Sequence, residues 1–249
     1  MLTQKDFGKM DAQEIWLMQQ VVAQIARKLA TALGRRYRQQ TGGTQLDLRR
    51  SWRRSLKYGG ELLDLATRER KIKKAKLILL CDVSGSMDHY SRFLLQFIYA
   101  LQKELRGIET LVFSTRLTRI TDLLRKRGLE EGLEALAQQV HDWSGGTNIG
   151  ACLRTFNRHL ARRLLGRKTV VMIMSDGWDR GDPRLLAEEM SRLSRQAYRL
   201  IWLNPLLGSP HYQPICQGMQ AALPYIDYFL PVHNVESLVR LGKTLQPLW

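Results

Sequence analysis

Cysteine is scarce in this sequence, with three residues in 249, and their placement excludes two kinds of small protein. Cys81, Cys152 and Cys216 stand alone, far apart and in an odd number. This pattern fits neither a disulfide framework nor a zinc knuckle. Cys81 lies in an apolar run, where a cysteine behaves as a small hydrophobic residue. We therefore expect a reduced, cytoplasmic protein.

Long apolar runs are absent as well. No stretch of about 20 apolar residues occurs, so the sequence predicts no transmembrane helix. The first residues, MLTQKDFGKMDAQE, are polar and include acids, unlike a secretory signal. No G-x-x-x-x-G-K-S/T pattern is present, which excludes a nucleotide-binding P-loop. Hydrophobic residues nevertheless make up 44% of the chain, which favours a packed core over disorder.

Acidic residues are outnumbered, since 39 lysines and arginines face 23 acids for a formal net charge of +16. Residues 27–76 hold 16 basic and 4 acidic residues, or +12, so the rest of the chain carries only +4. Such a segment can bind nucleic acid, anionic lipid or an acidic protein surface, or can be a solvated linker. It lacks a recognisable nucleic-acid fold signature. All of these alternatives stay open.

The pattern changes near residue 76, which predicts an N-terminal extension over 1–76 and a domain over 77–249. In the extension, a three-and-four spacing predicts an amphipathic helix over 11–33, and a short helix is expected between Gly42–Gly43 and Gly59–Gly60. In the domain, strand and helix patterns alternate, with strands expected at 77–83, 110–113, 117–120, 169–174, 198–203 and 226–230, and helices at 91–106, 129–140, 148–165, from 182, and 235–245. This alternation predicts an α/β fold with a Rossmann-like doubly wound, mostly parallel central sheet and helices on both faces.

Oxygen-bearing side chains follow two of the expected strands. The run LILLC ends in Asp82, which is followed by Ser84 and Ser86, and VVMIMS ends in Asp176. The loop WSGGTNIG adds Thr147 at the glycine-loosened start of a helix. Ligands of open parallel sheets bind beyond the carboxyl ends of the strands, where the strand order reverses. If the two strands flank that reversal, the five side chains converge on one crevice.

Two carboxylates and three hydroxyls form a donor set made only of oxygens. Such a set, without histidine or cysteine nearby, favours Mg²⁺ or Mn²⁺ over zinc. Taken alone, Asp82 with its two serines favours an Asx-type turn that closes a strand. The addition of Thr147 and Asp176, in order, favours the metal site. Asp88 and Asp179 are expected to solvate loops or to cap helices.

A strand that ends in an aspartate is also typical of phosphoryl-transfer enzymes with an aspartate nucleophile. That chemistry usually has a second acid two residues later, where this chain has Ser84. No lysine occurs in a clear companion motif. A hydrolase that uses the Asp82 crevice is therefore ranked third, behind the two interpretations given at the end of this section.

In this order, DVSGSM, the GGT of 145–147 and the SDG of 175–177 resemble the metal-ion-dependent adhesion site (MIDAS) of von Willebrand factor A (VWA) domains. The flanks resemble the CoxE-like branch of that superfamily: SDGWDRGDPRLLAEEMSRL, RLIWLNPLLG, GMQAALPYIDYFLPVHNVESL and, upstream, LDLRRSWRRSLKYGG. The resemblance covers roughly residues 43–240, and all five site positions match. The region before Gly43 looks short beside the leaders of many relatives.

The resemblance implies a VWA fold and a protein-binding module rather than an enzyme, with the metal held by Asp82, Ser84, Ser86, Thr147 and Asp176. CoxE-like proteins are associated with MoxR-type AAA+ ATPases, and the pair is thought to act as a chaperone. It remodels or matures a client protein, including metal-cofactor insertion into molybdenum hydroxylases such as carbon monoxide dehydrogenase. We therefore expect a metal-dependent adaptor of such an ATPase. The alternative is a nucleic-acid-binding protein that uses the basic segment and has an idle metal site.

Overall fold

The computed structural model describes residues 5–7, 37–39, 45–46, 48–56, 65–70, 76–104, 107–127, 131 and 146–245. The helix predicted over 11–33 lies outside these residues, as does nearly all of the one predicted over 129–140. The division of the chain at residue 76 therefore stays a prediction. Among the described residues, no helix is both long and apolar enough to cross a membrane.

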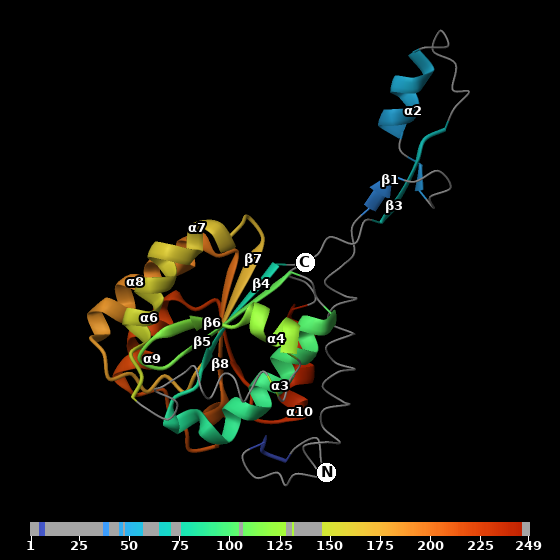
Figure 1. Cartoon of the computed structure of the whole chain (residues 1–249). Helices are drawn as coiled ribbons and strands as arrows, with labels where there is room; N and C mark the ends of the chain where they lie inside the picture. The colour runs from blue at the N-terminus through green and yellow to red at the C-terminus, as the bar shows by residue number, and fades with distance from the viewer. Residues whose placement is uncertain are drawn as a thin grey trace.

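A six-stranded sheet forms the centre of the fold (Figure 1). Its strands are β4 (Lys76–Asp82), β5 (Ile108–Phe113), β6 (Leu117–Arg119), β7 (Thr169–Met174), β8 (Arg199–Asn204) and β9 (Tyr228–Pro231). Their order is β6-β5-β4-β7-β8-β9, and every neighbouring pair is parallel except β5 with β6. The predicted doubly wound, mostly parallel sheet is thus confirmed. The order reverses between β4, which ends in Asp82, and β7, which Asp176 follows by two residues.

The continuous apolar runs of β4 and β7 exist because both faces of the sheet are covered. In β4, Leu77, Leu79 and Cys81 point into one core, whereas Ile78 and Leu80 point into the other. The same alternation in β7 follows from the two-residue period of a strand. The free Cys81 thus packs as a small hydrophobic residue, as expected.

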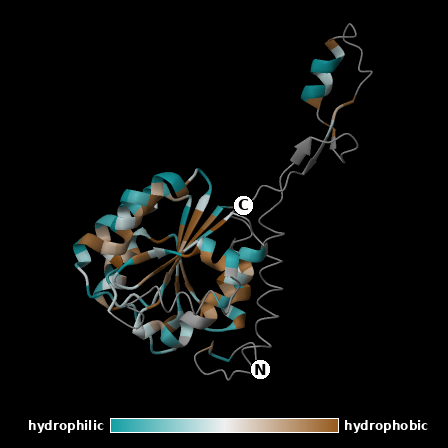
Figure 2. Cartoon of the chain, in the orientation of Figure 1, coloured by the Kyte–Doolittle hydropathy of each residue, from teal (hydrophilic) through white to brown (hydrophobic). Residues whose placement is uncertain are grey.

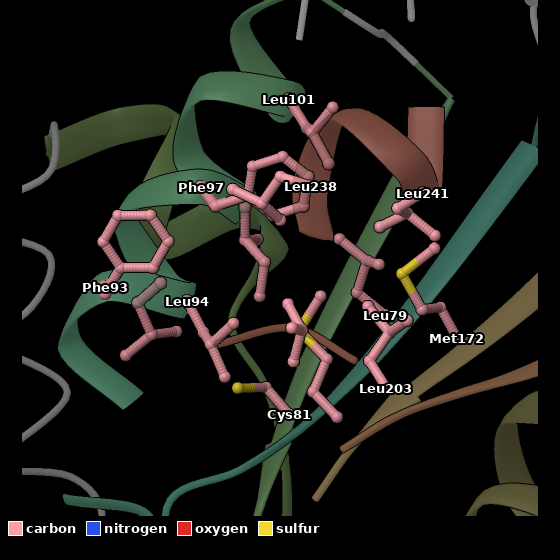
Figure 3. Close-up of a cluster of buried hydrophobic side chains, with 14 of the residues drawn as sticks. Leu79, Cys81, Phe93, Leu94, Phe97, Leu101, Met172, Leu203, Leu238 and Leu241 are labelled. Atoms are coloured by element: carbon pink, nitrogen blue, oxygen red, sulfur yellow. The ribbon is translucent and has the colours of Figure 1, made fainter. Parts of the chain in front are cut away.

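Helices α3 (Asp88–Glu104), α4 (Thr121–Arg127) and α10 (Val235–Leu245) cover the first face. Figure 3 shows α3 and α10 packing over β4 through residues such as Phe97, Leu238 and Leu79. Helices α6 (Ile149–Thr155), α7 (Ala161–Leu164), α8 (Pro183–Gln196) and α9 (Gln217–Ala222) cover the second face. Apolar residues accordingly follow the strands and the inner sides of the helices (Figure 2).

The helices depart from the sequence pattern in three places. The single helix predicted over 148–165 is divided, because a π-helical turn at Phe156–Leu160 separates α6 from α7. Helices α4 and α9 were not predicted, because with seven and six residues they are too short to show a clear period.

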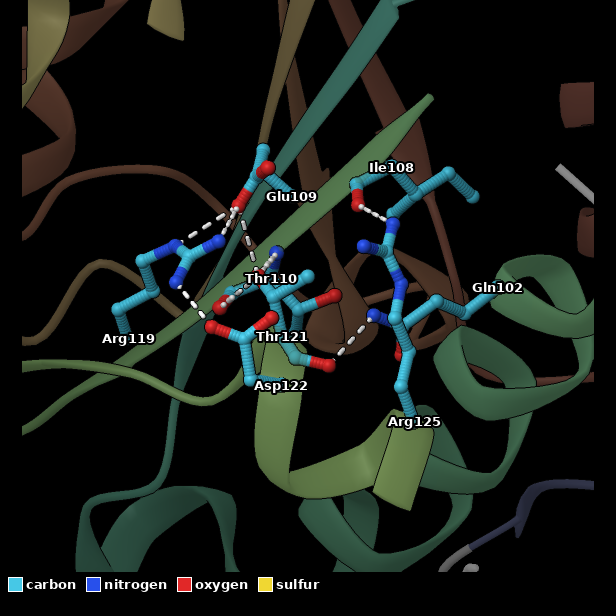
Figure 4. Close-up of polar contacts among 8 residues, drawn as sticks. All are labelled: Gln102, Ile108, Glu109, Thr110, Arg119, Thr121, Asp122 and Arg125. Atoms are coloured by element: carbon cyan, nitrogen blue, oxygen red, sulfur yellow. Dashed lines mark hydrogen bonds and ion pairs between the residues drawn. The ribbon is translucent and has the colours of Figure 1, made fainter. Parts of the chain in front are cut away.

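The antiparallel strand β6 is fastened to β5 by polar contacts that Figure 4 shows. The Glu109 carboxylate accepts hydrogen bonds from Arg119 (2.8 Å) and from the Thr121 hydroxyl (2.9 Å). The same hydroxyl accepts a bond from the backbone N–H of Thr110 (2.9 Å). These contacts hold the edge strand β6 and the start of α4 against β5.

Residues near the N-terminus pack against the first face. The backbone N–H of Phe7 donates to the carbonyl of His233 (2.8 Å), and the Phe7 ring stacks on Phe93 with centroids 3.4 Å apart. The Tyr90 hydroxyl donates to the Asp6 carboxylate (3.3 Å). Phe7 is thus part of the buried core of the domain.

A second, smaller unit precedes the large sheet. Strands β1 (Tyr37–Gln39), β2 (Gln45–Leu46) and β3 (Thr67–Arg70) form an antiparallel sheet in the order β1-β3-β2. Helix α2 (Leu48–Ser55) lies beside this sheet, within the interval where a short helix was expected. Figure 1 shows this unit standing apart from the six-stranded sheet.

Candidate metal centre

The carboxyl end of β4 places Asp82 at the base of the site. Asp82 is the last residue of the strand and is fully buried. The backbone N–H of Ser84 donates to its Oδ1 (3.0 Å), and the Ser84 and Ser86 hydroxyl oxygens lie 3.3 Å apart. The Asx-type turn that the sequence allowed is therefore present. It also holds the two serines on the same side of the loop.

The loop after β7 repeats this arrangement. The backbone N–H of Trp178 donates to Oδ1 of Asp176 (3.0 Å), and Asn204 donates to the Asp176 carbonyl (3.0 Å). Gly177 between them has φ +83°, a left-handed conformation that glycine adopts without strain. A side chain at Gly177 would also overlap Met219, so the turn depends on this glycine in two ways.

The third loop carries Thr147 to the same place. The carbonyl of Thr147 accepts a hydrogen bond from the backbone N–H of Arg180 (2.9 Å), which ties this loop to the one after β7. The next residue, Asn148, donates its N–H to the carbonyl of Ser114, just after β5 (2.9 Å). The Asn148 side chain also caps α6 by accepting from the N–H of Ala151. Backbone hydrogen bonds thus join the Thr147 loop to the loops that follow β7 and β5.

The loop after β4, the loop after β7 and the Thr147 loop enclose a cleft of about 690 Å³. It is lined by Ser84, Gly85, Ser86, Gly146, Thr147, Trp178, Asp179, Arg180 and Cys216. The three predicted hydroxyl residues thus face one cleft. The two predicted acids, Asp82 and Asp176, are not among the lining residues and lie buried at the ends of adjacent strands.

The surroundings of Asp82 favour a positive charge nearby. Burial raises the pKa of its carboxyl to about 6, because desolvation disfavours the charged form. Hydrogen bonds from the Ser175 hydroxyl (2.6 Å) and from Ser84 oppose this rise in pKa, whereas the negative charge of Asp176 adds to it. A cation in the cleft would offset the cost of these two buried carboxylates.

The donor set fits a hard divalent cation. All five predicted residues supply oxygen, the donor that Mg²⁺ and Mn²⁺ prefer. Each carboxylate oxygen of Asp82 accepts one hydrogen bond and has a further lone pair. In the described part of the chain, no three residues among His, Cys, Asp and Glu gather as metal ligands. A cation at this cleft would therefore depend on the hydroxyls, and the assignment of the five residues as ligands stays a prediction.

Two residues of the site were not singled out as functional by the sequence. The Ser175 hydroxyl donates to Asp82 and accepts from the N–H of Gly177 (3.0 Å), which links the ends of β4 and β7. Asp179 lines the cleft, and its Oδ1 accepts from the N–H groups of Ile149 (2.9 Å) and Gly181 (3.1 Å). The expected capping role of Asp179 is thus observed at α6. Its Oδ2 is buried without a hydrogen-bond partner in the described structure. The signal in the sequence was its position three residues after Asp176.

Comparisons with known proteins agree with this architecture. The family model described as "VWA domain containing CoxE-like protein" matches residues 18–238. Among solved structures, the conserved hypothetical protein BatB from Bacteroides thetaiotaomicron has a TM-score of 0.50 and 17% identity, covering 70% of this chain and 98% of that one. No curated protein matches the chain.

Two further structures are similar at lower TM-scores. A von Willebrand factor type A protein from Catenulispora acidiphila scores 0.48 at 13% identity, over 73% of this chain and 44% of that one. Proximal thread matrix protein 1 from the mussel byssus, with a zinc-occupied MIDAS motif, scores 0.45 at 18% identity, over 70% and 48%. This chain therefore spans less than half the length of these two proteins. The likeness to BatB shows the fold, and the family match extends over most of the residues. The chain belongs to the family of CoxE-like proteins that contain a VWA domain.

Proposed function

We propose that the cleft binds Mg²⁺, or Mn²⁺ in its place, and through this ion an acidic residue of a partner protein. The observation that carries the proposal is the convergence of three loops where the strand order reverses. There Ser84, Ser86 and Thr147 line one cleft, next to the buried carboxylates of Asp82 and Asp176. Membership of the CoxE-like VWA family supports a role in protein interaction and makes a divalent metal plausible.

The charges around the cleft favour an acidic partner. The three hydroxyls are neutral donors, so the side of the ion turned to the cleft would keep its attraction for a carboxylate. Arg180 also lines the cleft and adds a second positive charge there. Asp82 and Asp176 do not line the cleft, so their carboxylates would attract the ion through their charge and through bridging water.

In this proposal the chain is a binding module and not an enzyme. It serves as adaptor or co-chaperone of a MoxR-type AAA+ ATPase in the maturation or remodelling of a client protein, such as a metalloenzyme. The resemblance of its motifs to CoxE-like proteins supports the ATPase and the client. The scattered free cysteines support the cytoplasm as its compartment.

The test measures metal and partner binding on the same variants. Calorimetry should show Mg²⁺ binding to the wild type and none to Asp82→Ala, because that change removes a carboxylate from the site. Affinity for the MoxR-type ATPase of the same cell should fall about tenfold or more in EDTA, the usual range of a coupling between two ligands. Thr147→Ala should weaken the complex in Mg²⁺ and remove most of its sensitivity to EDTA.

Thr155→Ala is the matched control, since Thr155 is exposed at the far end of α6. It should behave as the wild type. Equal Mg²⁺ affinity of wild type and Asp82→Ala would remove the site assignment. A wild-type complex indifferent to EDTA would show that the ion does not bridge the two proteins.

A further inference from the structure

The small N-terminal unit exposes an unusual amount of apolar surface. Eight large hydrophobic residues are exposed in the described structure, and five of them lie between residues 46 and 65. They are Leu46 (50% exposed), Leu48 (71%), Trp52 (59%), Leu56 (65%) and Leu65 (54%). Single exposed apolar residues are ordinary, but a concentration of this kind marks a binding surface.

Helix α2 carries two of these residues, Leu48 and Trp52, and a third, Leu56, directly follows its last residue. Leu48, Trp52 and Leu56 follow one another at a spacing of four, which places them in one stripe on the same side of a helix. The inward side carries serines instead: Ser51 and Ser55 are buried. The Ser51 hydroxyl accepts from the N–H of Ala66 (2.9 Å), just before β3. The helix is thus fastened through its polar side, and this contact leaves the apolar side outward.

Arginines border the stripe. Arg49 and Arg53 directly follow Leu48 and Trp52, are exposed, and lie along one flank of the apolar side. Four of the eight residues of α2 are arginines, and none is acidic. We call Leu48, Trp52, Leu56, Arg49 and Arg53 the α2 surface. It joins an apolar stripe to a row of positive charges.

We propose that the α2 surface binds reversibly to an anionic lipid surface. A membrane interface accepts both parts, because the apolar side chains enter the acyl boundary while the arginines remain among the anionic headgroups. Tryptophan is enriched at this depth. A nucleic acid would neutralise the arginines but leave Leu48 and Leu56 in water. The helix is about 12 Å long at 1.5 Å per residue, so its contact area gives reversible rather than permanent attachment.

The charge of the surface is tested with the full-length chain and sedimenting vesicles. The wild type should bind vesicles of equal parts phosphatidylglycerol and phosphatidylcholine at least about tenfold more tightly than phosphatidylcholine alone. Arg49→Gln with Arg53→Gln should weaken binding about 30-fold, since one arginine near an anionic surface contributes about fivefold. The control pair Arg162→Gln with Arg163→Gln, exposed on α7, removes the same charge and should change binding far less.

The apolar stripe is tested separately. Leu48→Ser with Trp52→Ser should weaken vesicle binding about tenfold or more, whereas Ile215→Ser, at an equally exposed apolar residue of the large domain, should not. Lipids brominated on the acyl chain should quench part of the wild-type tryptophan fluorescence. This quenching should be lost in Trp52→Phe and kept in Trp178→Phe, which removes the second tryptophan that is exposed among the described residues. Thermal unfolding of each variant shows that the fold is intact.

Vesicle binding should not respond to EDTA, because the α2 surface contains none of the predicted metal ligands. Three results would overturn the inference. One is a wild type that does not bind the anionic vesicles, and another is binding that the arginine and stripe variants leave unchanged. The third is a loss, in the same variants, of affinity for a single-stranded RNA or for the ATPase while vesicle binding persists.

Discussion

Helices α2 and α8 are both amphipathic, yet they bury opposite sides. In α8, Leu186, Met190 and Leu193 are buried against the sheet. In α2, Ser51 and Ser55 are buried, while Leu48 and Trp52 are exposed. A periodic sequence therefore shows that a helix has two sides, but it does not show which side faces the protein.

The difference follows from what each helix packs against. Helix α8 lies on one face of a six-stranded sheet, where apolar contact is available along its whole length. Helix α2 is instead fastened by a hydrogen bond from the backbone N–H of Ala66 to the Ser51 hydroxyl. The large domain is thus stabilised by apolar burial, and the apolar residues of α2 are available for another surface.

The sharpest way to test this comparison is to truncate one tryptophan in each region. Trp202 is fully buried, and its indole N–H donates to the Ser175 carbonyl (2.8 Å). Trp202→Ala should lower the free energy of unfolding by about 3–5 kcal/mol through cavity formation. Trp52→Ala should change it by no more than about 0.5 kcal/mol. Denaturant titration measures both, and similar losses in the two variants would contradict the comparison.

A second variant tests whether the N-terminal residues belong to the large domain in energetic terms. Phe7 is buried and stacks on Phe93. Phe7→Ala should therefore lower the free energy of unfolding by about 3 kcal/mol. Leu46→Ala, at a half-exposed position of the small unit, is the control and should have little effect. An unchanged unfolding midpoint for Phe7→Ala would show that this contact contributes no stability.

The pH dependence of stability should report the buried Asp82. Its pKa is raised from 3.8 to about 6 in the folded protein. Between these values the folded state binds more protons than the unfolded state, so this carboxyl makes the metal-free protein less stable as pH rises. Relative to wild type, Asp82→Asn should gain about 2–3 kcal/mol above pH 6 from the removal of this cost, and nothing below about pH 4. A difference that is constant from pH 4 to pH 7 would disprove this account.

The smallest predicted effect concerns the start of α8. The Asp182 side chain caps this helix by accepting from the N–H of Arg184 (2.9 Å), and Pro183 occupies the first helical position. Asp182→Ala should cost about 1 kcal/mol of unfolding free energy, the usual contribution of such a cap. Glu188→Ala, exposed in the middle of α8, is the control. Equal thermal midpoints for the two variants would refute the capping contribution.

Much of the large domain could be predicted because its signals are local. The centres of β4 and β7, at 77–81 and 170–174, are apolar at every position, and both faces of the sheet are covered. The start of α8 was visible in Asp182–Pro183, since a cap and a first-turn proline act within a few residues. The division of the helix over 148–165 by a π-helical turn was not visible, because packing sets it.

The sequence by itself determined which chemistry stands at the ends of the strands: an acid after each of two buried runs, and hydroxyls in the loops. The tertiary structure alone decided that Ser84, Ser86 and Thr147 share one cleft, that Asp179 joins them, and that Asp82 is buried. It also decided that α2 turns its apolar side outward. Local sequence fixes periodicity and functional groups, whereas contacts between residues far apart in the chain depend on the order of strands and on the surface that each helix meets.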